Sequence, residues 1–159
     1  MGKKKAKPER KEKETMQDLA WFRYNLRRFL RFSEKAARAC GVTPQQHQLM
    51  LGIAGFTDDG RATISDLAEF LQERNNSVVG LVERAAESGL VRRRASTTDR
   101  RQVVVTLTAR GKEILSTLTE LHHEEVRRVK AGFLTRPQLK REPTSGENDS
   151  RTRRRGQNG

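Results

Sequence analysis

The sequence has few of the side chains from which disulfides, metal sites and redox centres are built. Its 159 residues include one cysteine and three histidines. The single cysteine, Cys40, excludes an internal disulfide and a cysteine-based zinc cluster, and its place on an apolar helix face favours a structural role over redox sensing. His122 and His123 are neighbours that would point to different sides of a helix, and His47 is distant in the sequence. We therefore expect no metal site and no cofactor.

Long apolar segments and catalytic constellations are also missing from the sequence. No run approaches the roughly 18 apolar residues of a membrane span, and no signal-type apolar segment follows the basic N-terminus. We therefore expect a cytoplasmic, nucleoid-associated protein that does not contact a membrane. The sequence has no nucleophile–base pair, no paired carboxylates in an apolar setting and no phosphate-binding loop, so we expect no enzymatic activity.

Positive charge is what the sequence has in excess. The net charge is +13 and the isoelectric point is about 10.8, which is typical of proteins whose partner is a polyanion, either nucleic acid or an anionic surface. Much of this charge lies in residues 1–14 and 136–159, each with seven Lys or Arg residues against three acidic ones. Both segments are polar and aperiodic, which predicts a basic flexible N-terminal arm and a basic disordered C-terminal tail. Such tails can bind DNA or be merely solvated, and charge alone does not decide between the two.

Between the tails, the apolar pattern predicts one domain over residues 15–135 with a long helix at each end. The first helix covers about 15–40, where apolar residues recur at steps of three and four, and Gly41 ends it. The last covers about 108–133 and carries a similar stripe. The stripe of the last helix consists of Leu115, Leu118, His122, Val126, Val129 and Phe133.

A helix-turn-helix and a hairpin are predicted between the long helices, over about 43–108. Pro44 starts one helix after a capping Thr43, and Thr63 starts the next. After the polar residues 73–76 a further helix turns Val78, Leu81, Val82 and Ala85 inward, and Gly89 ends it in a left-handed conformation. Residues 91–94 and the alternating residues 103–107 then form a hairpin around a polar loop. The predicted fold class is mainly α (α+β): a winged helix-turn-helix with a small β-hairpin wing.

The helix after the polar break is the candidate recognition helix. Its outward side chains suit double-stranded DNA, because Asn can read adenine, Arg can read guanine, and first-turn amides suit phosphate. The predicted DNA-binding residues are Arg74, Asn75, Asn76, Ser77, Val79 and Gly80 in this helix, and Arg100 and Arg101 in the wing loop.

Some of these residues also have a structural explanation. Asn75 or Asn76 could cap the helix, and Gly80 could serve helix packing instead of a close approach of the DNA backbone. Asp99 is expected to pair with a neighbouring arginine and stabilise the wing. The arginines at positions 92–94 are weaker candidates, because a basic strand edge can be solvated.

The order of these elements, together with three local strings, resembles the MarR family of winged helix-turn-helix transcriptional regulators. The strings are Thr63-Ile64-Ser65-Asp66-Leu67-Ala68, Asn76-Ser77-Val78-Val79-Gly80-Leu81-Val82-Glu83-Arg84 with Ser88-Gly89-Leu90-Val91 after it, and Asp99-Arg100-Arg101-Gln102-Val103-Val104-Val105-Thr106-Leu107-Thr108 with Gly111 after it. The resemblance covers roughly residues 15–133, and its wing string is the most specific part.

The resemblance implies a homodimer whose first and last long helices form the interface. The implied dimerisation residues are Leu19, Phe22, Leu26, Leu118, Val126, Val129 and Phe133. It also implies recognition helices in major grooves, wings in minor grooves, and release from DNA by small molecules or oxidants in many members. The family usually ends with a further helix, which Pro143, Ser145 and Gly146 would interrupt here.

Two functions follow from these observations. The first is a transcriptional regulator, most often a repressor, that binds a near-palindromic operator as a dimer and responds to a small-molecule effector of unknown identity. The alternative is a nonspecific architectural or nucleoid-type DNA-binding protein that depends on its basic tails.

Overall fold

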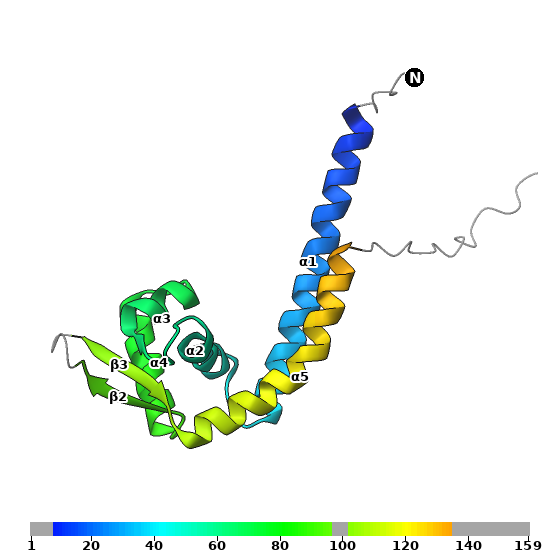
Figure 1. The fold of residues 1–159 in the computed structure, drawn as a ribbon. Coiled ribbons are helices and arrows are strands. Elements are labelled where there is room, and N and C mark those ends of the chain that lie inside the picture. Colours follow the sequence, from blue (N-terminus) through cyan, green and yellow to red (C-terminus); the bar gives the residue numbers. More distant parts are fainter. Residues whose placement is uncertain (1–7, 97–101, 135–159) are drawn as a thin grey trace, which may run out of the picture.

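A computed structural model describes residues 8–96 and 102–134 of the chain, and Figure 1 shows its fold. Five helices and three short strands make up this part of the chain. They are α1 (Pro8–Ala39), α2 (Pro44–Gly55), β1 (Ala62–Thr63), α3 (Ile64–Leu71), α4 (Asn75–Glu87), β2 (Val91–Ala95), β3 (Val103–Leu107) and α5 (Ala109–Leu134). Every predicted helix and both predicted strands are present, whereas β1 was not predicted.

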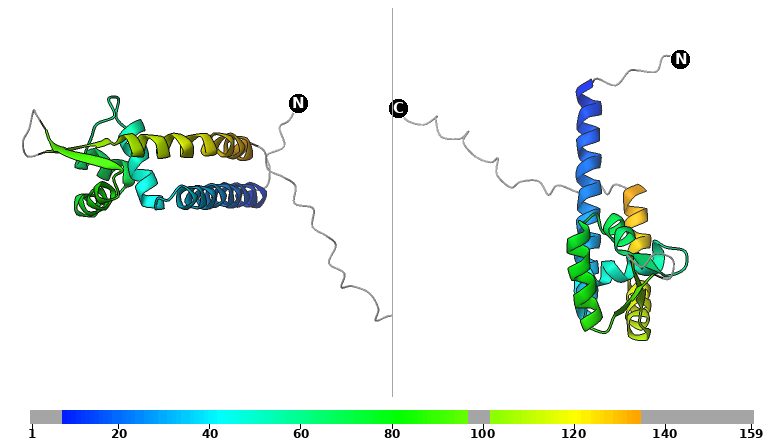
Figure 2. Two further views of the ribbon diagram at one scale, coloured as in Figure 1. Left: turned by 90° about the horizontal axis from the view of Figure 1, so that it is seen from below. Right: turned by 90° about the vertical axis from the view of Figure 1, so that its left-hand side faces the viewer.

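The two long helices lie side by side and form a stalk (Figures 1 and 2). The indole Nε1 of Trp21 on α1 donates a hydrogen bond of 2.8 Å to the backbone oxygen of Gly132 on α5. A Cβ atom at Gly132 would lie 3.0 Å from the amide oxygen of Asn25, so the glycine permits the close approach of the helices. Helix α1 begins at Pro8, seven residues before its predicted start, so the prediction of a flexible arm over residues 1–14 is wrong for residues 8–14. Residues 1–7 lie outside the described part.

A compact lobe of α2, α3, α4 and the sheet sits at one end of the stalk (Figure 1). The strand order is β1-β3-β2, and both pairings are antiparallel. Val91 pairs with Leu107 and Ala95 with Val103, so β2 and β3 form the hairpin that the alternating pattern predicts. The two residues of β1 extend the sheet by pairing with β3, because the turn before α3 passes its free edge.

The lobe has a continuous apolar core that includes the first turns of α5. The fully buried side chains come from every layer: Leu49, Met50, Ile53, Leu67, Val78, Val82, Leu90, Val105 and Leu118. Burial of such aliphatic side chains is the main favourable term in folding, at roughly 25 cal/mol per Å². The core therefore holds the recognition helix α4 against α2, α3 and the sheet.

The helix ends of the lobe are defined by local hydrogen bonds, as predicted. Thr43 and Thr63 each form a capping box, the first with Gln46 and the second with Asp66. Gly89 has φ of +71°, and the amide of Leu90 beyond it donates 2.9 Å to the oxygen of Ala85. These caps specify where α2, α3 and α4 begin or end without reference to the rest of the fold.

Candidate nucleic-acid interface

Helix α4 presents one face to the core and the opposite face to solvent. Val78, Leu81, Val82 and Ala85 are buried, as predicted from their spacing. The predicted contact residues lie on the other side or at the start of the helix, and all except the half-buried Gly80 are exposed: Arg74, Asn75, Asn76, Ser77 and Val79. The N-terminal half of α4 thus offers amide, hydroxyl and guanidinium groups from one surface.

The N-terminus of α4 is not capped by a side chain in the described structure. The N-cap residue is Arg74, which makes no side-chain cap hydrogen bond. Asn75 and Asn76 are the first two helical residues, so the structural explanation of either one as the cap is wrong. The first turn of α4 therefore keeps amide donors at the positive end of the helix dipole, where an anion such as a phosphate is stabilised.

Gly80 is not required by helix packing. A Cβ atom at this position would meet only the guanidinium nitrogen of Arg84, at 3.3 Å, which is the far end of a flexible side chain. Gly80 lies one turn beyond Asn76 on the solvent-facing side. Of the two explanations for Gly80, helix packing is thus not supported. The remaining explanation is the close approach of another molecule to this position.

Strand β2 adds a basic edge next to α4. Arg92, Arg93 and Arg94 are exposed, and the guanidinium of Arg93 lies 3.1 Å from the carboxylate of Glu83 on α4. This ion pair was not predicted, because its partners lie on different elements and no sequence periodicity relates them. It neutralises a carboxylate on the outer face of α4 and orients one arginine of the strand. The wing residues Asp99, Arg100 and Arg101 lie outside the described residues.

The predicted dimerisation residues fall into two groups. Leu19, Phe22 and Leu26 are exposed on α1, and Val126 and Val129 are partly buried on α5. Leu118 is completely buried in the core of its own chain, so its assignment to a dimer interface is wrong. The reason is that the first part of α5 packs on the lobe before the helix joins the stalk (Figure 1), and Leu118 belongs to the core cluster of the lobe. The side chain of Phe133 is outside the described part.

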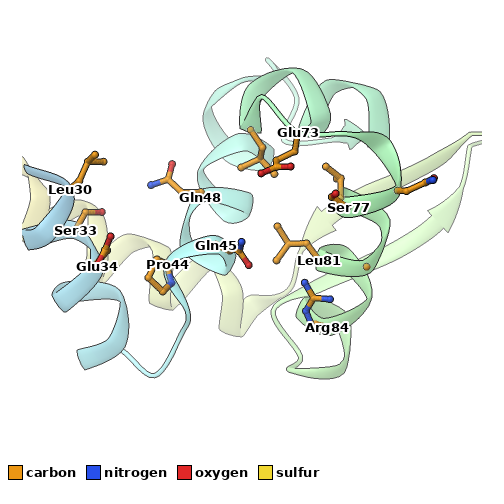
Figure 3. Close-up of a pocket in the computed structure, with 14 residues that line it drawn as sticks. Leu30, Ser33, Glu34, Pro44, Gln45, Gln48, Glu73, Ser77, Leu81 and Arg84 are labelled. Atoms are coloured by element: carbon orange, nitrogen blue, oxygen red, sulfur yellow. The ribbon is translucent and has the colours of Figure 1, made fainter. Parts of the chain in front are cut away.

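A pocket of about 650 Å³ lies where the stalk meets the lobe, between α1, α2 and α4. Figure 3 shows Leu30, Ser33 and Glu34 of α1 on one side and Ser77, Leu81 and Arg84 of α4 on the other. The lining mixes apolar groups with a carboxylate and a guanidinium, which suits a small amphipathic molecule. The pocket also reaches Asn76 and Gly80, so it borders the candidate DNA-binding surface.

The described residues were also compared with the requirements of a metal site, a membrane span and a disulfide. Across residues 8–96 and 102–134, no group of three or more His, Cys, Asp or Glu side chains is arranged to hold a metal ion. In the same ranges, no helix is long and apolar enough to cross a membrane. Cys40 is partly buried as a free thiol beside the core.

Comparison with known proteins links these features to one family. The profile of the MarR family matches residues 41–102. An uncharacterized HTH-type transcriptional regulator of Bacillus subtilis (strain 168), YfiV, is 38% identical over 85 residues. These residues are 54% of this chain and 51% of that protein, so the match spans about half the length of each.

Solved structures extend the similarity to the long helices. AbsC, a MarR family transcriptional regulator from Streptomyces coelicolor, is 22% identical and superposes with a TM-score of 0.63 over 86% of both chains. The M. tuberculosis transcriptional regulator MosR, solved in complex with DNA, is 26% identical with a TM-score of 0.54 over 69% of this chain and 77% of its own. These proteins are named as regulators and not as enzymes, in agreement with the prediction. Residues 41–102 thus match the model of the MarR family, which bears out the predicted resemblance, and the described chain shares the fold of these solved regulators.

Proposed function

We propose that this protein is a DNA-binding transcriptional regulator of MarR type, a repressor that binds a near-palindromic operator as a homodimer. The observation that carries the proposal is the uncapped, solvent-facing start of α4, on a helix whose second half is paired with the basic strand β2 through Glu83 and Arg93. The same fold is bound to DNA in the M. tuberculosis relative.

The chemistry of this surface supports two kinds of contact. The amides at the start of α4 and the arginines of β2 suit phosphate oxygens, which set position and orientation on the duplex. The exposed carboxamide of Asn76 suits the N6 and N7 edge of adenine in the major groove. Glu83 and Glu87 occupy the outer face of the second half of α4, where like charge would oppose phosphate. We therefore assign DNA contact to the first half of the helix.

The dimer is supported by an exposed apolar stripe on α1. Leu19, Phe22, Leu26 and Leu30 keep 39–58% of their surface accessible, although their spacing places them on one side of the helix. A second copy that covers this stripe would bury it and bring two lobes together. Two recognition helices would then be spaced to reach successive major-groove half-sites, roughly 34–36 Å apart.

The pocket between α1, α2 and α4 supports a response to a small molecule. Its walls belong to both the stalk and the recognition helix. An occupant that binds one arrangement of these helices better than another would shift the population of the DNA-binding form. We therefore propose this pocket as the effector site, with an amphipathic molecule as its class of ligand.

The experiment that tests the function is selection of bound fragments from random or genomic DNA in the presence of excess nonspecific competitor. A regulator yields one near-palindromic sequence, protected in a footprint. The double variant Asn76→Ala/Arg101→Ala should lose this footprint while its circular dichroism spectrum stays unchanged. Gln17→Ala, an exposed residue of α1 far from α4, is the matched control and should keep the footprint. A normal footprint from the double variant would refute the assigned DNA surface.

The alternative, a nonspecific architectural protein, makes a different prediction for the basic tails. A chain limited to residues 8–134 should bind the selected sequence more weakly and with a smaller salt dependence, but with the same sequence preference. Loss of the preference in this shortened chain would favour the architectural function.

The dimer is tested separately by sedimentation at micromolar concentration. The variant Leu19→Lys/Leu26→Lys places two charges in the exposed stripe and should yield monomers, whereas Gln17→Lys on the other side of α1 should not. A wild-type monomer under these conditions would contradict the dimer proposal.

A further inference from the structure

Two histidines that are far apart in the sequence meet where the lobe joins the stalk. The ring of His47 on α2 lies 5.0 Å from the ring of His122 on α5, measured between centroids. Both side chains are at least nine-tenths buried. Phe29 and Phe32 of α1 contact the ring of His122 edge-on, at 5.9 Å and 5.2 Å. The pair is thus enclosed by three helices in a largely apolar setting.

Each ring has a buried nitrogen without a hydrogen-bond partner in the described structure. These atoms are Nδ1 of His47 and Nε2 of His122. The other nitrogen of His122, Nδ1, lies 2.6 Å from the backbone oxygen of Leu118. Because a carbonyl oxygen only accepts, Nδ1 of the neutral ring carries the proton and Nε2 is a bare lone pair. Buried polar atoms are normally paired, so an unpaired site of this kind calls for an explanation.

The charged groups around the pair are few. Helix α2 contains no titratable side chain other than His47. On α5, Glu125 is buried one turn beyond His122 and is paired with Arg128 at 3.5 Å. On α1, the nearest acidic residue to Phe32 in the sequence is Glu34, which is exposed on another face and lies 3.8 Å from Arg38. Burial first, and the nearby His122 second, lower the pKa of His47 to about 4.

We propose that His47 and His122 form an acid-sensitive joint, in which proton uptake loosens the packing of the lobe on the stalk and weakens binding to the operator. The DNA part of this inference rests on the function proposed above. The proton comes from water and forms an N–H bond at the unprotonated nitrogen of the neutral His47 ring, and no other bond breaks. The proton places a cation beside the ring of His122, 5.0 Å away between centroids, in this largely apolar setting, which opposes closure of the joint.

The position of the pair explains why the joint would affect DNA binding. Helix α2 packs on α1 and α5 of the stalk and also on α3 and α4 of the lobe. It is therefore a direct connection between the interface that would hold two copies together and the helix that would enter the groove. When the joint is loosened, the distance between the two recognition helices varies more. Binding to both half-sites then costs more conformational entropy, because the two helices must first be held at one spacing. Binding to a single site without sequence preference depends less on this spacing.

The first test does not involve DNA. Imidazole proton chemical shifts of the full-length protein are followed by NMR from pH 8 to pH 4, together with amide hydrogen exchange of α2 corrected for the intrinsic rate. The chain has only three histidines, so His47→Gln, His122→Phe and His123→Gln assign every signal. We expect exchange in α2 of the wild type to accelerate about tenfold between pH 7.5 and pH 5.5. Thermodynamic linkage yields this ratio of opening constants for a histidine whose pKa is 6.5 in the open form and about 4 in the enclosed form.

Matched variants distinguish the joint from general acid effects. His47→Gln removes the titrating ring, and His122→Phe keeps an aromatic ring in contact with Phe29 and Phe32. His47→Gln should reduce the acid response of α2 to less than twofold, whereas His122→Phe, which leaves the burial of His47 in place, should lower the response only in part. His123→Gln, which changes the exposed neighbouring histidine, should respond as the wild type does. An unchanged wild-type exchange rate, or a full response in His47→Gln, would overturn the proposal.

The second test measures affinity for the selected operator at both pH values and constant ionic strength. Wild type and His123→Gln should bind the operator more weakly at pH 5.5 than at pH 7.5, while His47→Gln should lose less than twofold in affinity. If no sequence-preferring DNA is found, the proposed function fails and the exchange experiment still decides on the joint. All measurements are repeated with EDTA. A response that disappears with EDTA would assign the pair to a metal ion and refute proton sensing.

Discussion

Gly111 allows the closest contact between α5 and the lobe, and the substitution Gly111→Ala tests whether this contact supports the fold. A Cβ atom at this position would lie 2.1 Å from the backbone oxygen of Leu90, a separation that real Cβ atoms do not adopt. The amide of Thr108 donates 3.0 Å to that same oxygen, and its hydroxyl donates 2.7 Å to the oxygen of Gly89. The start of α5 is therefore bonded directly to the end of α4 and the start of β2.

The cost of Gly111→Ala follows from these distances. The two backbones must separate by about 1 Å, and overpacking of this kind typically costs about 1–3 kcal/mol. The hydrogen bonds of Thr108 to Leu90 and Gly89 would lengthen, at roughly 1 kcal/mol each if lost. The better helix propensity of alanine offsets up to about 1 kcal/mol of this. We therefore expect the free energy of unfolding to fall by roughly 3 kcal/mol.

The assay is urea unfolding followed by circular dichroism, with all variants at one protein concentration because a dimer depends on concentration. Gly55→Ala is the matched control, since a Cβ atom there meets nothing within 4 Å. Its stability should stay within about 0.5 kcal/mol of the wild type. A loss below about 1 kcal/mol for Gly111→Ala, with an unchanged urea dependence, would refute the inferred backbone contact.

Three further predictions concern the lobe. Thr63→Ala removes one half of the capping box with Asp66, whose bonds are 2.8 Å and 3.2 Å; it should cost about 1–2 kcal/mol in urea unfolding, and Thr63→Ser should recover most of it. Gly80→Ala should raise stability by up to about 1 kcal/mol and weaken operator binding in an anisotropy titration; unchanged affinity would show that DNA does not approach this position closely. Because the pKa of His47 is lowered to about 4 in the folded chain from an ordinary 6.5, its contribution to stability is fully present above pH 6.5 and is lost as the pH falls toward 4. The unfolding constant should thus be roughly thirtyfold larger at pH 5 than at pH 7.5, and a pH-independent unfolding midpoint for wild type that matches His47→Gln would contradict this.

Much of the lobe could be predicted from local signals. Caps and left-handed glycines depend on a few neighbouring residues, which is why Thr43, Thr63 and Gly89 marked the helix ends correctly. The alternation of residues 103–107 predicted β3 for the same reason. The two residues of β1 have no such signal, because their strand geometry exists only through pairing with β3.

The stripes of the long helices show where sequence reasoning reaches its limit. Periodicity identified an apolar face on α1 and on α5, but it could not say what covers each part of that face. In the structure Ala36 of α1 is buried, whereas Leu19 and Leu26 of the same helix are exposed. On α5, Leu118 belongs to the core of the lobe and not to an interface. Burial depends on neighbours that are distant in the sequence, and the spacing of apolar residues along one helix does not show which neighbours these are.

The sequence alone determined the helix-turn-helix, the hairpin and the residues that the start of α4 turns to solvent, because backbone rules and apolar spacing act over one or two turns. Only the tertiary structure decided that α1 extends to Pro8 and that Arg93 pairs with Glu83. It also placed His47 beside His122, where sequence reasoning had treated them as unrelated. Each of these outcomes depends on how separate elements pack, and such contacts are set by the three-dimensional arrangement of the chain and not by its local pattern.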